Sequence, residues 1–113
     1  MIIYLSGPMT GSRDSAAVFD RVRRELEEGG KHQVINPAVL EGVATDGVLS
    51  YEDYMSIDKM LLSKAEALML LPGWTRSRGC NRELGFAEAL GLKIYEYSKD
   101  GGHFGAFKGW RPE

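Results

Sequence analysis

The chain has 113 residues, of which 43% are hydrophobic and 27% charged, and its formal net charge is −2. This length predicts one domain with a modest core, and the charge argues against a protein that coats nucleic acid. Cys80 is the only cysteine, which excludes an intrachain disulfide framework and favours a reducing compartment such as the cytoplasm. No apolar run approaches the ~18 residues of a membrane span, and no signal-peptide pattern opens the sequence.

The N-terminal half of the chain alternates between strand and helix patterns. Residues 1–6 form an apolar run that predicts a buried strand, followed by a Gly- and Pro-containing loop at 7–11. Residues 12–30 show helical spacing, residues 33–36 predict a second strand, and residues 38–50 predict an irregular connection. We expect the apolar face of the helix to enter the core through Ala17, Phe19, Val22 and Leu26.

The same alternation continues through the C-terminal half. Residues 51–65 show helical spacing, residues 65–71 predict a buried strand, and residues 81–90 predict a helix that ends at Gly91. Residues 93–97 predict a fourth strand with mixed faces. The core candidates of the helix at 51–65 are Tyr54, Ile57, Leu61 and Leu62.

Alternating strands and helices predict an α/β fold with helices on both faces of a parallel sheet. Right-handed crossovers leave a flavodoxin-like or Rossmann-like three-layer sandwich with four to five parallel strands. We expect residues 1–97 to form this domain and residues 98–113 to form a C-terminal tail.

Polar side chains collect where the predicted strands end, which is where open α/β sheets bind ligands. The first strand delivers Tyr4 and Ser6, the helix before the third strand carries Asp58, and the helix after it carries Glu83. Two carboxylates beside a C–N or C–O glycosidic bond can take two roles, because one can attack the anomeric carbon while the other donates and accepts protons. The phenol of Tyr4 could hydrogen-bond the nucleophile or a sugar oxygen.

Each of these residues also has a purely structural interpretation. Asp58 fits a solvated position on an amphipathic helix, and Glu83 near a helix N-terminus stabilises the helix dipole by roughly 0.3–1 kcal/mol. Tyr4 fits a core position with a satisfied hydroxyl, and Ser77 fits a helix N-cap. No metal-ligand spacing and no known phosphate-binding glycine motif appears, so we expect neither a metal nor a cofactor.

Five segments of the chain form a joint pattern: Tyr4–Gly11 (YLSGPMTG), Asn36–Pro37, Tyr54–Asp58 (YMSID), Leu71–Trp74 (LPGW) and Ser77–Glu83 (SRGCNRE). This pattern resembles the small phage and bacterial proteins of the nucleoside 2-deoxyribosyltransferase-like superfamily, the DUF4406 group. The resemblance covers roughly residues 1–97 and does not extend into the tail.

The better studied relatives are nucleoside 2'-deoxyribosyltransferases and nucleoside 5'-monophosphate N-glycosidases, in which a glutamate forms a covalent glycosyl-enzyme intermediate. The resemblance implies this role for Glu83, whose S-x-G-x-x-x-E context is completed by Ser77 and Gly79. It implies that Asp58 protonates the departing base or orients the nucleophile. It also matches Tyr4 to the tyrosine of the family and Ser77 to the serine that holds the 5'-phosphate in the monophosphate hydrolases.

The remaining candidate residues would bind substrate. We expect backbone and hydroxyl groups of the two loops to contact the sugar or phosphate, through Ser6, Gly7, Gly11, Gly79 and Asn81. Trp74 would stack on the base or act as a lid or interface residue. Residues 8–10 (PMT) replace the Ser-Ile-Arg-like stretch that supplies phosphate contacts in the hydrolases.

We therefore expect an N-glycosidase or deoxyribosyltransferase that cleaves the N-glycosidic bond of a nucleotide or nucleoside through a glycosyl-glutamate intermediate, without a cofactor. One alternative is a non-catalytic module that binds or sequesters a nucleotide, and another is a partner-binding α/β domain. Small size and the resemblance predict a homodimer or higher homo-oligomer, with the tail at the interface or in a neighbouring site. We expect neither a nucleic-acid polymer nor a membrane as partner.

Overall fold

The computed structural model describes residues 1–9, 13–40, 43–97 and 104–106. One five-stranded sheet runs through this part of the chain in the order β2-β1-β3-β4-β5. Its strands are β1 (Ile2–Ser6), β2 (Gln33–Ile35), β3 (Ala67–Leu70), β4 (Lys93–Tyr97) and β5 (Phe104–Ala106).

The first four strands are parallel, as the sequence predicts. β5 is antiparallel to β4 and comes from the segment predicted only as a tail. At the end of β1, Ser6 pairs with Leu70 of β3, so these two central strands end together.

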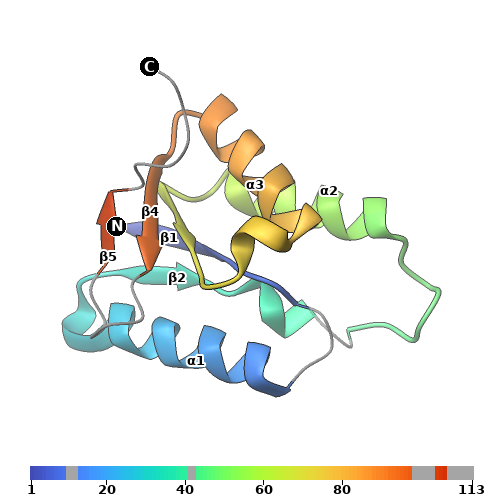
Figure 1. Cartoon of the computed structure of the whole chain (residues 1–113), viewed down its shortest axis with the longest axis horizontal. Helices are drawn as coiled ribbons and strands as arrows, with labels where there is room; N and C mark the ends of the chain where they lie inside the picture. Colours follow the sequence, from blue (N-terminus) through green and yellow to red (C-terminus); the bar gives the residue numbers. More distant parts are fainter. Residues whose placement is uncertain (10–12, 41–42, 98–103, 107–113) are drawn as a thin grey trace.

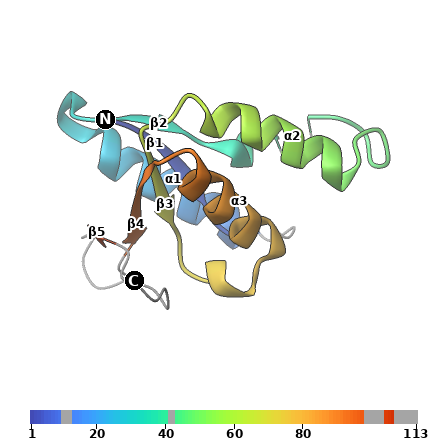
Figure 2. The same cartoon turned by 90° about the horizontal axis from the view of Figure 1, so that it is seen from above.

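Three helices cover the two faces of the sheet and complete the predicted three-layer sandwich. α1 (Arg13–Glu27) lies on one face, and α2 (Tyr51–Leu62) and α3 (Arg78–Ala89) lie side by side on the other (Figures 1 and 2). Short 3-10 turns occur at Glu28–Gly30, Pro37–Leu40 (η2) and Trp74–Arg76. Among the described residues, no helix combines the length and apolar character that crossing a bilayer requires.

Alternation along the central strands divides the core between the two faces. On the α1 side, Ile3 and Leu5 pack with Phe19, Val22 and Leu26. On the other side, a second cluster contains Tyr4, Leu68, Leu70, Leu62 and Leu84. Side chains of a strand alternate between faces, so Tyr4 and Ser6 point toward α2 and α3.

The helical core predictions are partly wrong. Ala17 of α1 is exposed, and Val18 packs against the core instead. In α2 the buried side chains are Met55, Asp58 and Leu62, whereas Tyr54, Ile57 and Leu61 are only half-buried.

Ser77 sets the start of α3, which begins at Arg78 and not at Asn81 as the sequence analysis expected. The Ser77 hydroxyl accepts a hydrogen bond from the Cys80 N–H at 3.2 Å, the usual N-cap interaction. Just upstream, Gly73 has φ +88°, and a Cβ there would lie 3.1 Å from Cγ of Pro8. This glycine therefore lets the chain turn from β3 toward α3 without strain.

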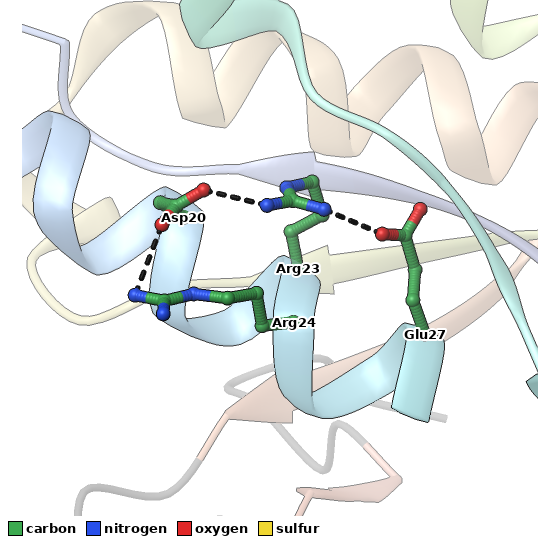
Figure 3. Close-up of polar contacts among 4 residues, drawn as sticks. All are labelled: Asp20, Arg23, Arg24 and Glu27. Carbon is green, nitrogen blue, oxygen red and sulfur yellow. Dashed lines mark hydrogen bonds and ion pairs between the residues drawn. The ribbon is translucent and has the colours of Figure 1, made fainter. Parts of the chain in front are cut away.

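The outer face of α1 carries a row of ion pairs (Figure 3). Arg23 bridges Asp20 and Glu27 at 2.7 and 2.6 Å, and Arg24 contacts Asp20 at 3.0 Å. Exposed pairs of this kind stabilise a helix only slightly. We therefore attribute the position of α1 to its buried apolar face.

A capping box at Ser50 fixes the start of α2, and we predict a measurable loss of stability when it is broken. The Ser50 hydroxyl accepts from the Asp53 N–H at 3.0 Å, and the Asp53 carboxylate accepts from the Ser50 N–H at 2.8 Å. Ser50→Ala should lower the free energy of unfolding by about 1 kcal/mol, measured by urea denaturation. Ser56→Ala, at an exposed position within α2, is the matched control, and an equal loss in both variants would contradict the capping role.

Candidate active site

The carboxylate of Glu83 lies at the centre of a buried hydrogen-bond group. The side chain is only 3% exposed and stands in the second turn of α3. The Tyr4 hydroxyl donates to Oε2, and the Ser6 hydroxyl donates to Oε1 at 2.7 Å. Both donors come from β1, whose alternation points them to the same side of the sheet. Each oxygen of the carboxylate therefore has one fixed donor, which sets its orientation.

Asp58 brings a second carboxyl group to the same place from α2. It is 4% exposed, and its side chain interacts with both Glu83 and Tyr4. The structure therefore joins three residues that lie far apart in the sequence, and it disagrees with the solvated interpretation of Asp58. An oxygen that is this deeply buried normally keeps a hydrogen-bond partner, which these neighbours supply.

Burial controls the protonation of this group. Desolvation raises the pKa of Glu83 to about 8, although hydrogen bonds from Tyr4 and Ser6 oppose the shift. Desolvation also raises the pKa of Asp58, opposed by its hydrogen bonds to Glu83 and Tyr4. The pKa of Tyr4 lies far above its usual range because of burial and the two neighbouring carboxylates, so its phenol stays a neutral donor. We conclude that the two carboxyl groups share a proton near neutral pH.

Both carboxyl groups line a cavity of about 370 Å³, a size suited to a small-molecule ligand. Ser77 and Gly79, at the N-terminal end of α3, also line it. The N-terminus of a helix attracts anions through its free N–H groups and its dipole. Gly7 lines the cavity as well, and a Cβ there would lie 3.0 Å from Cβ of Leu71, so a larger residue would require Leu71 to shift.

The model of the family described as "Domain of unknown function (DUF4406)" matches residues 1–96. The chain belongs to this family. No curated protein matches this DUF4406 chain in sequence. Similarity to proteins with a stated activity comes from the comparison of its fold with solved structures.

Solved structures with a similar fold include the following three proteins. A 2-desoxiribosyltransferase from Leishmania mexicana aligns with a TM-score of 0.66 at 22% identity, over 88% of this chain and 65% of its own. The CMP N-glycosidase BcmB from Clostridium botulinum aligns with a TM-score of 0.59 at 20% identity, over 86% of this chain and 71% of its own. A conserved protein from Enterococcus faecalis V583 aligns with a TM-score of 0.66 at 19% identity, over 88% and 65%. At these identities the likeness establishes the shared fold.

Most of the predicted site residues of the DUF4406 chain lie together. Four form the buried hydrogen-bond group, Tyr4, Ser6, Asp58 and Glu83. Three others line the cavity, Gly7, Ser77 and Gly79. Ser6 was predicted as a substrate ligand, but it is fully buried and its hydroxyl contacts Glu83. Gly11 lies outside the described residues.

Two predicted substrate ligands do not line this cavity. Trp74, in the turn after β3, is buried, and its indole N–H donates to the Glu96 carboxylate of β4 at 2.8 Å. The Asn81 amide donates to the carbonyls of Thr75 and Ser77 at 3.2 and 2.8 Å. Both side chains thus stabilise the loop that precedes α3 through hydrogen bonds.

The opposite wall of the cavity was not predicted from the sequence. Pro37, Leu40, Ala44 and Asp46 come from the irregular connection after β2. Tyr51, Tyr54 and Met55 come from one face of α2. The spacing of these α2 residues with Asp58 was a signal for that face, but the connection after β2 has no periodic pattern.

The part of the chain that the structure describes offers neither a reactive thiolate nor a cluster of metal ligands. Cys80 lines the cavity, but burial raises the pKa of its thiol, which disfavours the reactive thiolate. Within residues 1–9, 13–40 and 43–97, no group of three His, Cys, Asp or Glu side chains is placed to hold a metal ion.

We predict that ionisation of the carboxyl pair weakens the fold as the pH rises. In the folded chain the Glu83–Asp58 pair keeps one proton up to a pKa of about 8, whereas Glu83 in the unfolded chain has its usual pKa of 4.5. The folded state therefore binds more protons in this interval, so the free energy of unfolding falls as the pH rises from about 4.5 to 8. Glu83→Gln breaks up the pair, and over the interval it should lose less stability than the wild type by more than about 1 kcal/mol.

Urea denaturation near pH 5 and near pH 8 measures this difference. Glu28→Gln, at an exposed position after α1, controls for removal of a carboxylate elsewhere. Parallel stability profiles for wild type and Glu83→Gln would show that Glu83 does not titrate in this way.

Proposed function

We propose that this chain cleaves the N-glycosidic bond of a nucleoside or nucleotide, with Glu83 as the nucleophile. The observation that carries the proposal is the buried Glu83 carboxylate, held at both oxygens by Tyr4 and Ser6 beside a second carboxyl group in a ligand-sized cavity. Fixed donors orient a nucleophile in advance, which lowers the entropic cost of attack. The carboxyl pair supplies the two chemical roles that such a cleavage needs.

In the first step, a carboxylate oxygen of Glu83 attacks C1' of the sugar. The C1'–N bond breaks, its electron pair leaves with the base, and the base nitrogen takes a proton from Asp58. The shared proton lies on Asp58 when Glu83 reacts, because Tyr4 and Ser6 both donate to Glu83 and favour its anionic form. The product of this step is a glycosyl ester of Glu83.

In the second step, an acceptor resolves the ester. Water attacks C1' and gives its proton to the carboxylate of Asp58, or a second base attacks in its place, and Glu83 leaves as a carboxylate. Water as acceptor makes the chain a hydrolase, and a base makes it a transferase. The same two carboxyl groups serve both outcomes, as in retaining glycosyl chemistry generally.

The similar structures support this class of reaction, since one is named a 2-desoxiribosyltransferase and another a CMP N-glycosidase. The chain spans 65% of the length of the first and 71% of the second. Binding of the sugar and any 5'-phosphate by Ser77, Gly79 and the N-terminus of α3 belongs to this proposal. The homo-oligomer, the role of the tail and the cytoplasmic location stay predictions from the sequence.

A base-release assay tests the proposed reaction. The protein is incubated with ribo- and deoxyribonucleosides and their 5'-monophosphates, with and without an added acceptor base, and free base is resolved by chromatography. We expect release that falls by about 10³-fold or more in Glu83→Gln, because the variant keeps the shape of the site and loses the nucleophile.

Glu88→Gln on the same helix, at a position that does not line the cavity, is the control. Full activity in Glu83→Gln would refute the assignment of the nucleophile. Unchanged substrates in every mixture, together with tight nucleotide binding, would favour a non-catalytic binding module.

We also predict a bell-shaped pH dependence of kcat/KM, because the reactive pair must hold one proton. The pair loses its last proton near pH 8, so activity should fall above about that pH. Asp58→Asn should lower kcat by about 10²–10⁴-fold and lose the basic limb of the profile. A basic limb that survives in Asp58→Asn would show that another group supplies the proton.

A further inference from the structure

The wall of the cavity opposite α3 has a chemistry of its own. It is formed mainly by the apolar side chains of Pro37, Leu40, Ala44 and Met55. Its polar groups are the carboxylate of Asp46 and the hydroxyls of Tyr51 and Tyr54, and of these the carboxylate alone accepts hydrogen bonds without donating any. A largely apolar slot with a few polar groups suits a flat, partly polar ring, because apolar walls stabilise the ring faces and the polar groups fix its edge.

Local hydrogen bonds define the turn that carries Asp46. In this turn the Val48 N–H donates to the Thr45 carbonyl at 3.1 Å. Gly47 occupies the next position with φ +86°, as the third residue of a type II turn requires. The capping box at Ser50 then defines the start of α2, whose side chains form the same wall.

One face of α2 connects Asp46 to the reacting groups. Asp58, Met55, Tyr54 and Tyr51 are spaced as i, i−3, i−4 and i−7, and all of them line the cavity. Asp46 precedes by five residues Tyr51, with which this helix begins. From Asp58 to Tyr51 the helix rises about 10 Å, which leaves room for a nucleobase between the catalytic pair and Asp46.

Charge decides which part of a substrate faces Asp46. The N-terminus of α3, with Ser77 and Gly79, attracts an anionic or hydroxyl-bearing sugar end. The carboxylate of Asp46 repels a phosphate and accepts hydrogen bonds only. With C1' beside Glu83, the base therefore extends along α2 toward Asp46.

We propose that Asp46 makes this site selective for nucleobases that carry an exocyclic amino group, such as cytosine and adenine. The proposal rests on the proposed glycosidic cleavage and names its substrate class. The amino group donates to the Asp46 carboxylate. Uracil and hypoxanthine place a carbonyl oxygen at that position, where it faces the carboxylate with no proton between them, so this hydrogen bond is lost.

The test compares matched substrates that differ only at this group, cytidine with uridine and adenosine with inosine, in the sugar form that the chain accepts. We expect kcat/KM to favour the amino base of each pair by about tenfold or more. Asp46→Asn should remove that preference, because its amide offers a donor to the carbonyl of the other base. Thr45→Ala, at an exposed position of the same turn that does not line the cavity, should keep the preference.

The binding affinity of Glu83→Gln for the same nucleosides gives a second reading that does not depend on turnover. A binding preference for the amino bases that disappears when Asp46→Asn is added supports the proposed selectivity, whether or not base is released. Absence of base release would refute only the proposed cleavage. Equal kcat/KM and equal affinity within each pair overturn the selectivity while leaving the cleavage intact. If Asp46→Asn lowers kcat/KM equally for all substrates, the selectivity is also overturned, because an equal loss indicates a structural role for Asp46.

Discussion

A buried carboxylate that two hydroxyl groups hold by hydrogen bonds is the feature on which the rest of this site depends. Tyr4 and Ser6 reach Glu83 because they alternate with Leu5 on β1, so one strand supplies both donors and also a core residue on its other face. A shift of β1 by one residue would turn both hydroxyls toward α1. The pairing of β1 with β2 and β3 therefore positions the site as well as the core.

Burial of the carboxyl pair opposes the stability of the fold and serves the proposed chemistry. A buried, ionised carboxylate is costly unless it is hydrogen-bonded, and the raised pKa values of Glu83 and Asp58 reflect that cost. The same desolvation keeps a proton available to Asp58 near neutral pH and leaves Glu83 a weakly hydrated nucleophile. Perturbed carboxyl groups in a cavity are typical of catalytic sites, since structure alone gains little from them.

Much of the fold and part of the site could be read from the sequence, because both follow from short-range patterns. The four parallel strands and three helices were predicted from apolar periodicity and from glycine and proline positions. The family resemblance, through the S-x-G-x-x-x-E context, implied the role of Glu83. That Ser6 would hold Glu83 was not predicted, because the partner of a strand hydroxyl depends on which helix packs above it.

The opposite wall was missed for a similar reason. Asp46 and Leu40 lie in a connection without periodicity, and only the placement of η2 and α2 brings them to the cavity. Trp74 was expected to stack on a base or to act as a lid or interface residue, but it is buried and the carboxylate of Glu96 on the neighbouring strand binds its indole. Long-range packing decided each of these positions.

Trapping of the glycosyl ester tests the central claim most directly. A nucleoside with fluorine at C2' slows both steps, because the electron-withdrawing fluorine destabilises the positive charge that develops on the sugar. Peptide mapping by mass spectrometry of protein incubated with such a substrate should find the sugar attached to Glu83, and no adduct in Glu83→Gln. Base release without any adduct, or an adduct on another residue, would contradict the claim that the carboxylate held by Tyr4 and Ser6 is the nucleophile.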